Sequence, residues 1–203
     1  MKLDKSYGAI NARKNDIIRN AMKIDYDEFE YKGVGFDYEG MMGKIGYSMD
    51  EMRKIQLSHG VGNTPLIEMR NLTALARKYA PAGKGARIFI KDEAANASGS
   101  FKARRASIAV HHAKKLGYKG VIAATSGNYG AAEAAQAAMH GLKCIVVQEC
   151  YDDKKVGQPE ILEKQRICEA YGAEVVQLTV GPELFTTHLS LLEDTGYFNA
   201  SLY

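Results

Sequence analysis

The sequence predicts an α/β protein: a three-layer lobe with a mostly parallel sheet, preceded by a helical N-terminal extension. Three observations carry this prediction. From Lys91 onward, short apolar runs alternate with longer helical stretches. A glycine ends each of these helices, and Pro159 and Pro182 stand where two of them begin. Short apolar strands that alternate with helices are typical of βαβ units, and therefore of a parallel sheet.

The first sixty residues have a different pattern and form the predicted extension, residues 1–60. A helix is expected over residues 1–24, where four apolar side chains share one face: Ile10, Ile17, Ile18 and Met22. Residues 26–46 are rich in tyrosine, glycine and acidic side chains and resist assignment. Ser48, followed three residues later by Glu51, forms a capping box. This pair predicts a second helix that stops near Gly60.

The predicted lobe covers residues 61–203. Its upstream part holds two expected strands, Pro65–Met69 and Arg87–Lys91, with a helix over residues 71–79 between them. The core strands are expected at Val121–Ala124, Cys144–Val147, Val175–Val176 and Tyr197–Phe198. The helices before these strands end at Gly117, Gly141, Gly172 and Gly196, because glycine tolerates the left-handed conformation that follows a helix. Ligands bind beyond the carboxyl ends of parallel strands, so the loops there are the places to seek a site.

The first such loop leads into a helix through Ser98-Gly99-Ser100-Phe101-Lys102. Lys102 falls in the expected first helical turn, where the helix dipole disfavours a cation. Two interpretations remain open at this point. One is a solvated lysine, which the spacing alone favours. The other is a lysine whose lowered pKa lets its neutral amine act as a nucleophile.

The second loop is Thr125-Ser126-Gly127-Asn128-Tyr129-Gly130, between a core strand and an alanine-rich helix. Glycine and small residues at a strand-to-helix turn expose backbone N–H groups to an anion. The side chains of Thr125, Ser126 and Asn128 add further hydrogen-bonding groups. A simple cluster of helix-capping residues explains the same pattern, so the sequence leaves both interpretations open.

These two loops, with Gly62-Asn63-Thr64-Pro65-Leu66 upstream, resemble in order the motifs of fold-type II pyridoxal-phosphate (PLP) enzymes, the tryptophan synthase β-like family. The resemblance covers roughly residues 58 to 203. It implies PLP as cofactor and Lys102 as the Schiff-base lysine, which also moves protons at the substrate's α-carbon. It implies that Asn128 hydrogen-bonds the oxygen on the cofactor ring. The carboxylate of a small amino-acid substrate would be held, chiefly through backbone N–H groups, by Thr125, Ser126, Gly127, Asn128 and Tyr129.

The sequence departs from the family motif at two positions. Ala97 stands where the motif commonly has proline, and Ala103 stands where it has aspartate. Ala103 removes a carboxylate that could orient Lys102 or pair with Arg104. In addition, no glycine-rich phosphate loop follows Tyr171. We therefore expect an N-terminal portion of the family fold, with the C-terminal phosphate-binding lobe absent.

Within the family, the extension and Gln148–Tyr151 are most similar to thiolases of ornithine degradation. That similarity implies cleavage of a small oxo-amino acid with coenzyme A, assisted by a small α subunit. The alternatives are a lyase like threonine synthase or cysteine synthase, and a catalytically silent lobe that serves as a binding or assembly module. The family resemblance also implies a homo-oligomer for the complete protein, and a complementary C-terminal lobe as partner.

Composition argues against several other functions. The net charge is +3, from 27 basic and 24 acidic residues spread along the chain, so we expect no nucleic-acid partner. No apolar run reaches the length of a membrane span and no secretory signal is evident, so we expect no membrane association. The three cysteines lack metal-ligand spacing and predict reduced thiols in the cytoplasm. His111 and His112 point apart on a helix, so we expect no metal.

Overall fold

The computed structural model describes residues 3–31, 35–125 and 127–201. Its centre is a four-stranded sheet in the order β5-β4-β3-β6, and every neighbouring pair is parallel. The strands are β3 (Gly120–Ala124), β4 (Lys143–Tyr151), β5 (Glu174–Thr179) and β6 (Phe198–Asn199). The predicted α/β class and the four predicted core strands are confirmed.

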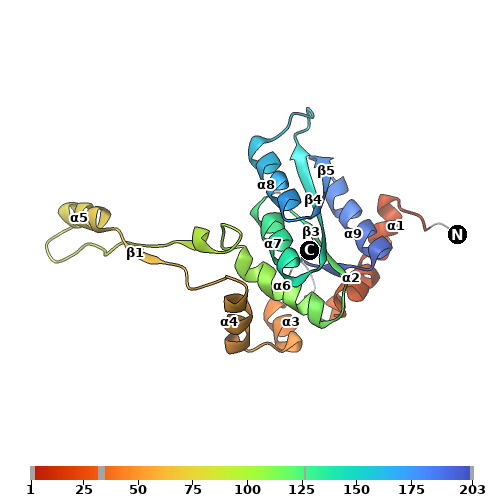
Figure 1. The fold of residues 1–203 in the computed structure, drawn as a ribbon, viewed down its shortest axis with the longest axis horizontal. Helices are drawn as coiled ribbons and strands as arrows, with labels where there is room; N and C mark the ends of the chain where they lie inside the picture. The colour runs from red at the N-terminus through yellow and green to blue at the C-terminus, as the bar shows by residue number, and fades with distance from the viewer. Residues whose placement is uncertain (1–2, 32–34, 126, 202–203) are drawn as a thin grey trace.

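Helices cover both faces of this sheet and make the three layers (Figure 1). One face carries α6 (Ala103–Lys115), α7 (Asn128–His140) and α8 (Pro159–Ala170). The other carries α9 (Glu183–Thr195), with α1 (Tyr7–Ala12) and α2 (Lys14–Met22) beside it. All of β3 is buried, as is most of α7, so the centre of the core lies where these two elements meet. The glycines after α6, α7, α8 and α9 have φ between +64° and +86°, as expected.

The helix expected over residues 1–24 is two helices, α1 and α2, separated at Arg13. Met1 and Lys2 of that prediction lie outside the described residues. The predicted apolar face is buried, with exposed fractions of 5% or less for Ile10, Ile17, Ile18 and Met22. Arg13, at the break, donates a hydrogen bond from its Nε to Glu193 Oε1 on α9, at 2.6 Å. The break therefore gives the extension a charged contact with the lobe.

The rest of the extension contains η1 (Tyr26–Glu28), α3 (Tyr38–Ile45) and α4 (Met49–Ser58). The capping box predicted for α4 is confirmed. The N–H of Glu51 donates to Ser48 Oγ at 3.2 Å, and the N–H of Ser48 donates to Glu51 Oε2 at 2.9 Å. Within the described ranges, every helix falls short of the length and apolarity that a membrane span requires.

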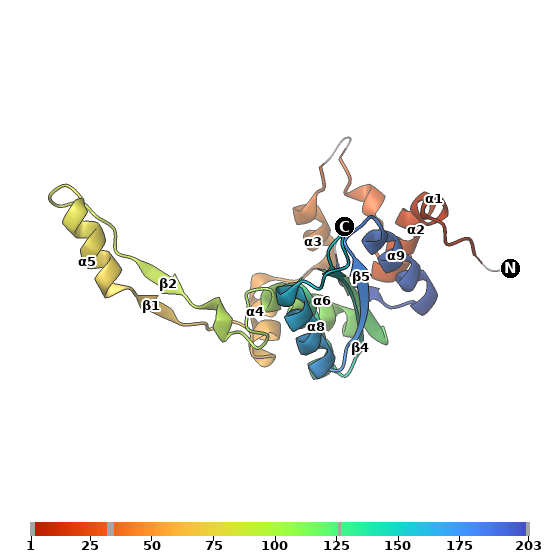
Figure 2. The same ribbon diagram turned by 90° about the horizontal axis from the view of Figure 1, so that it is seen from above.

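Residues 65–91, here called the arm, project away from the rest of the molecule (Figure 2). The arm consists of β1 (Leu66–Glu68), α5 (Arg70–Tyr79) and β2 (Phe89–Lys91). Both predicted upstream strands exist, but they pair antiparallel with each other, Ile67 opposite Ile90, and take no part in the parallel sheet. All three residues of β2 are exposed. The arm therefore has the apolar side chains of a buried element, but these side chains are exposed in the described structure.

Candidate active site

Lys102 lies at the N-cap of α6, one residue before the first helical turn in which it was expected. Its side chain is half-buried, and its Nζ lies 4.8 Å from the ring centroid of Phe101. The Phe101 side chain is itself 56% exposed. The lysine amine is thus held at the amino end of α6, on a side of the lobe where an apolar ring faces outward.

Two hydroxyls in the loop before Lys102 are buried without a partner. Within the described part of the chain, Ser98 Oγ and Ser100 Oγ have no hydrogen-bond partner. Between them, Gly99 has a φ of +73°, which glycine adopts without strain. A buried hydroxyl without a partner is unfavourable by about 1–3 kcal/mol, so such groups mark a place for a polar ligand. These orphaned hydroxyls beside a lysine fit a small, polar, aldehyde-bearing cofactor such as PLP.

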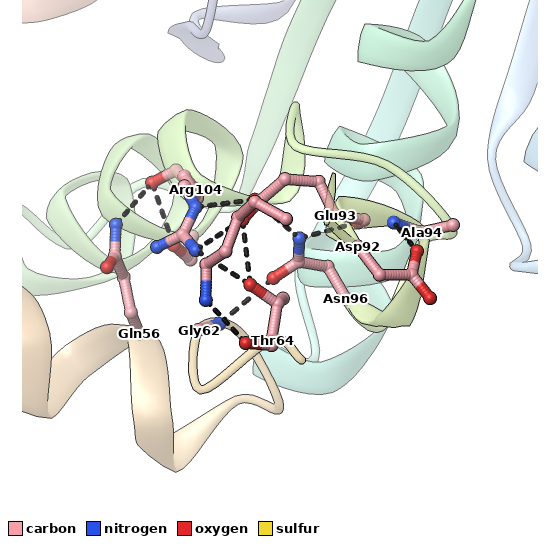
Figure 3. A network of polar contacts seen from close by, with 10 residues as sticks. Gln56, Gly62, Thr64, Asp92, Glu93, Ala94, Asn96 and Arg104 are labelled. Carbon is pink, nitrogen blue, oxygen red and sulfur yellow. Dashed lines mark hydrogen bonds and ion pairs between the residues drawn. The ribbon is translucent and has the colours of Figure 1, made fainter. Parts of the chain in front are cut away.

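A polar network fixes the loop before Lys102 to α6 and to the chain entering the arm (Figure 3). The Glu93 carboxylate, next to Asp92 at the start of this loop, accepts from Arg104 Nε at 2.7 Å and Arg104 Nη2 at 2.8 Å, and from Thr64 Oγ1 at 2.8 Å. Asn96 Nδ2 donates to Glu93 Oε2 at 3.0 Å, while Asn96 Oδ1 accepts from the N–H of Gly62 at 2.9 Å. The hydrogen bonds from Arg104, and then from Thr64, hold the pKa of Glu93 at about 2.

This network gives a structural reason for both departures from the family motif. The carboxylate that pairs with Arg104 comes from Glu93, while Ala103 is completely buried, where a carboxylate would lose its hydration. The N–H of Ala97 donates to the carbonyl oxygen of Gly60 at 3.2 Å. A proline at position 97 has no N–H and could not make this bond, which ties the end of the extension to the loop.

The second loop begins where β3 ends. The N–H of Thr125 continues the sheet by donating to Val147 O at 3.0 Å, and the N–H of Gly127 donates to Thr125 Oγ1 at 3.2 Å. Gly127 is the N-cap of α7, and the side chain of Asn128 is exposed. Ser126 lies outside the described residues. The first turn of α7 thus opens at the carboxyl edge of the sheet, where helix N–H groups without intrahelical acceptors can receive an anion.

Gly130 lets α7 approach the sheet closely. A Cβ at this position would lie 2.7 Å from Thr125 Cγ2 and 2.8 Å from Val146 Cγ1, which is closer than real Cβ atoms come. The last glycine of the Thr125–Gly130 motif therefore serves helix–sheet packing, and this packing sets the place of the loop's N–H groups.

The helices that the two loops enter, α6 and α7, pack side by side, and both begin at the end of the lobe where β3 ends. The guanidinium of Arg105, one turn after Lys102, stacks on the ring of Tyr129, with Cζ 4.5 Å from the ring centroid. The Tyr129 side chain is 8% exposed and its hydroxyl faces Glu133 and Ala200. Because the side chain of Tyr129 is buried, a ligand in this loop could contact Tyr129 through its backbone N–H.

Sequence reasoning named Arg104 as needing a carboxylate partner but missed the other residues that support the site: Glu93, Asn96, Arg105 and Glu133. The available signals were weak: Glu93 directly follows Asp92, and Glu133 is a polar residue in an alanine-rich helix. In the described ranges, no group of three histidine, cysteine, aspartate or glutamate side chains is arranged to hold a metal ion. His112 instead places its Nδ1 3.1 Å from the hydroxyl of Tyr47 in the extension.

The chain is similar in sequence to known proteins. The family described as "Pyridoxal-phosphate dependent enzyme" matches residues 57–203. The 2-amino-4-ketopentanoate thiolase beta subunit of Acetoanaerobium sticklandii is 71% identical over all 203 residues, which is 43% of that protein. The threonine synthase of Halalkalibacterium halodurans is 39% identical over 122 residues, covering 60% of this chain and 30% of that protein. The chain thus spans less than half the length of these relatives.

Solved structures give the same picture. A pyridoxal 5'-phosphate-dependent aspartate racemase has a TM-score of 0.58 at 26% identity, covering 77% of this chain and 46% of that one. A threonine deaminase has a TM-score of 0.57 at 30% identity, covering 76% of this chain and 44% of that one. In both cases the likeness covers most of this chain and less than half of the larger protein.

Proposed function

Because the chain belongs to the family of pyridoxal-phosphate-dependent enzymes, we propose that it forms the lysine-bearing part of a thiolase acting on 2-amino-4-oxopentanoate. In the proposed reaction the thiol of coenzyme A adds to the C4 carbonyl and the C3–C4 bond breaks. The thiol proton is transferred to C3, so the products are acetyl-CoA and alanine. The reaction would serve ornithine degradation. When bound, PLP supplies an electron sink next to the amino-bearing carbon.

The residues of this chain would bind and orient. Lys102 would hold the cofactor covalently through Nζ and move a proton at the substrate's α-carbon. The Asn128 side chain, exposed at the start of α7, would hydrogen-bond the ring oxygen of PLP. The substrate carboxylate would lie in the loop from Thr125 to Tyr129, which includes Ser126 and Gly127. It would accept chiefly from N–H groups at the start of α7, while Thr125, whose own N–H is bonded to Val147 O, would contribute its side chain. The Glu93–Arg104 network would keep the loop before Lys102 in place.

The observation that carries this proposal is the contact between α6 and the carboxylate loop, in which Arg105 stacks on Tyr129. Lys102 lies one turn before Arg105, and the carboxylate loop ends one residue beyond Tyr129. A lysine and an anion-binding helix end at one edge of a parallel sheet are the two parts that PLP chemistry on an amino acid needs. The buried hydroxyls of Ser98 and Ser100 support a polar ligand at the same place.

The thiolase is favoured over other members of the family by the extension. Similarity to two thiolase beta subunits, at 71% and 66% identity, runs through all 203 residues. The family match starts at residue 57, and the threonine synthase match covers only 60% of the chain. That more distant similarity nevertheless supports a second candidate, a lyase like threonine synthase or cysteine synthase. A silent lobe that serves assembly is the third.

We further propose that the arm packs against the remaining part of a longer protein, which would be the complementary C-terminal lobe. An isolated two-stranded hairpin is at best marginally stable in water. Seven large apolar side chains of the arm are at least 43% exposed: Leu66, Ile67, Leu72, Leu75, Tyr79, Phe89 and Ile90. The relatives are more than twice as long as this chain, so they contain material to cover these side chains.

Other partners follow from the names of the relatives. A protein called a beta subunit has at least one further subunit, and we propose a small α subunit and a homo-oligomeric assembly. We place the enzyme in the cytoplasm, with support from the three cysteines, which are all free and buried.

The test is to load the protein with PLP, reduce it with borohydride and map the labelled peptide. We expect the phosphopyridoxyl label on Lys102 and its loss in Lys102→Ala. Lys143→Ala is the matched control, because Lys143 is an exposed lysine at the amino end of β4, at the opposite edge of the sheet. Label spread over surface lysines would reject the assignment of Lys102.

Turnover then distinguishes the candidates. With the α subunit and the full-length protein, we expect acetyl-CoA and alanine from 2-amino-4-oxopentanoate and coenzyme A. Turnover of L-threonine or O-acetylserine in place of the oxo-amino acid would establish the lyase. Label on Lys102 without turnover of any of these would point to the silent lobe.

A further inference from the structure

Glu133 is an unusual side chain in its surroundings. It lies on α7 one turn after Tyr129, with alanines on either side, and it is completely buried. The Tyr129 hydroxyl lies 2.5 Å from Glu133 Oε1 and 2.6 Å from the carbonyl oxygen of Ala200. Ala200 directly follows β6 and is paired to β3 through its N–H. Tyr129 therefore connects a buried carboxyl group to the end of a strand.

A count of protons decides the state of this group. The Tyr129 hydroxyl has one proton, and it makes short contacts with two oxygens of the described residues, Glu133 Oε1 and Ala200 O. If Glu133 were ionised, both neighbours would be acceptors only, and one of the two short contacts would lack a proton. If Glu133 is protonated, it donates to the Tyr129 oxygen, and Tyr129 donates to Ala200 O. Only the protonated acid gives each contact its proton.

The surroundings of Glu133 agree with this count. Arg105 from α6 is the cation that faces it, across the ring of Tyr129. The Cys144 thiol faces it from β4, and burial raises the pKa of that thiol, so it stays neutral. From α8, the Cys168 thiol packs near Gly130 on the same helix. Burial raises the pKa of Glu133 to about 8, although the hydrogen bond with Tyr129 and the charge of Arg105 oppose the rise.

The second carboxyl oxygen of Glu133 also indicates that the acid is protonated. Glu133 Oε2 is buried and has no hydrogen-bond partner within the described residues. An ionised carboxylate carries charge on both oxygens, and each then needs a donor. A neutral acid can leave its carbonyl oxygen without a partner at much lower cost.

We propose that Glu133 is a neutral carboxylic acid that positions the carboxylate-binding loop through Tyr129. The relay from Glu133 to Tyr129 to Ala200 pins the first turn of α7 to the end of β6, and this turn carries the N–H groups assigned to the substrate carboxylate. When Glu133 ionises, Tyr129 donates to it instead of to Ala200 O, and that oxygen is left with the longer hydrogen bond from Arg105 Nη2 on α6, at 3.4 Å. The loop is then released from β6, and carboxylate affinity falls. The effect on substrate affinity rests on the proposed function, whereas the protonation state does not.

The first measurement is infrared difference spectroscopy of the full-length protein. We expect the carbonyl-stretch band of a protonated carboxylic acid at about pH 6, its absence in Glu133→Gln, and its loss as pH rises through about 8. Absence of this band from the wild type at about pH 6 would overturn the proposal. This readout needs no cofactor, so it decides the state of Glu133 even if Lys102 fails to bind PLP.

The second measurement is the dissociation constant of L-alanine from the PLP-loaded full-length protein, followed through the visible cofactor band. One proton with a pKa of about 8 predicts an approximately tenfold weakening between about pH 7 and pH 9. Glu133→Gln supplies a permanent N–H donor to Tyr129, so it should remove that component and keep the affinity of the low-pH state. Tyr129→Phe breaks the relay and should bind weakly at both pH values. The same weakening in Glu133→Gln as in wild type would overturn the positioning role.

Discussion

The lobe and the arm both contain apolar strands, but β3 of the lobe is buried and β2 of the arm is exposed. Ile122 in β3 is 0% exposed, whereas Ile90 in β2 is 46% exposed. Both isoleucines sit in short apolar strands that the sequence predicts equally well. The lobe strand has helices on both faces, whereas the arm strand pairs with β1 and, in the described part of the chain, is not covered by a second layer. An apolar strand in the sequence therefore predicts burial, but it does not specify which part of the protein covers the strand.

Replacing the two isoleucines tests this comparison most strongly. Ile122→Ala should lower the free energy of unfolding by about 2–5 kcal/mol, because it removes buried methyl groups and leaves a cavity. Ile90→Ala in the 203-residue chain should change it by less than about 0.5 kcal/mol, as at other exposed sites. Urea unfolding curves of both variants give the two values.

The same pair can be measured in the full-length protein. If the rest of the protein covers the arm, the effect of Ile90→Ala should grow to that of a buried position. An unchanged, small effect of Ile90→Ala in the longer protein would contradict the proposed packing of the arm.

A glycine-to-alanine pair sharpens the contrast between interior and surface. Gly130→Ala should destabilise the protein by about 1–3 kcal/mol, because the new Cβ overlaps Thr125 and Val146 in the packed interior. Gly43→Ala on α3 should stabilise it by about 0.5–1 kcal/mol, because it removes a flexible residue from a helix and meets no atom within 4 Å. Thermal unfolding of both variants should show opposite signs, and equal signs would contradict the close approach of α7.

The smallest expected effects on stability come from removing one ion-paired carboxylate in each region, Glu193 of the lobe and Glu68 of the arm. Glu193 accepts from Arg13 and Lys5 of the extension, and these contacts lower its pKa from 4.5 to about 2. Its folded-state pKa lies below the unfolded value, so its stabilisation is present above about pH 4.5 and is lost as pH falls toward 2. The difference in melting temperature between wild type and Glu193→Gln should follow that window.

The arm supplies the control for this pair. Arg87 Nη2 lies 3.1 Å from Glu68 Oε1, but the two side chains are 59% and 32% exposed. Exposed pairs contribute little, so Glu68→Gln should leave the melting temperature unchanged across the same pH range. A larger effect at Glu68 than at Glu193 would reverse the order expected from burial.

The positions of the candidate site's two loops could be predicted from sequence because their signals are local. Lys102 and the Thr125–Gly130 loop stand at the starts of helices, and the glycines that end those helices punctuate the pattern. The residues that support the site could not be predicted from the sequence. The partners of Glu93 lie up to 29 residues away along the chain, and Ala200 is 71 residues from Tyr129. No periodicity or spacing rule links such residues, because folding alone brings them together.

The sequence by itself determined the alternation of strands and helices, the capping box of α4 and the positions of the two loops. Each of these depends on the conformational preferences and periodicity of neighbouring residues. The tertiary structure decided that β1 and β2 leave the parallel sheet, that Glu93 pairs with Arg104, and that Glu133 is buried beside Tyr129. These depend on which surfaces pack together, and packing sets the burial that turns an ordinary glutamate into a neutral acid.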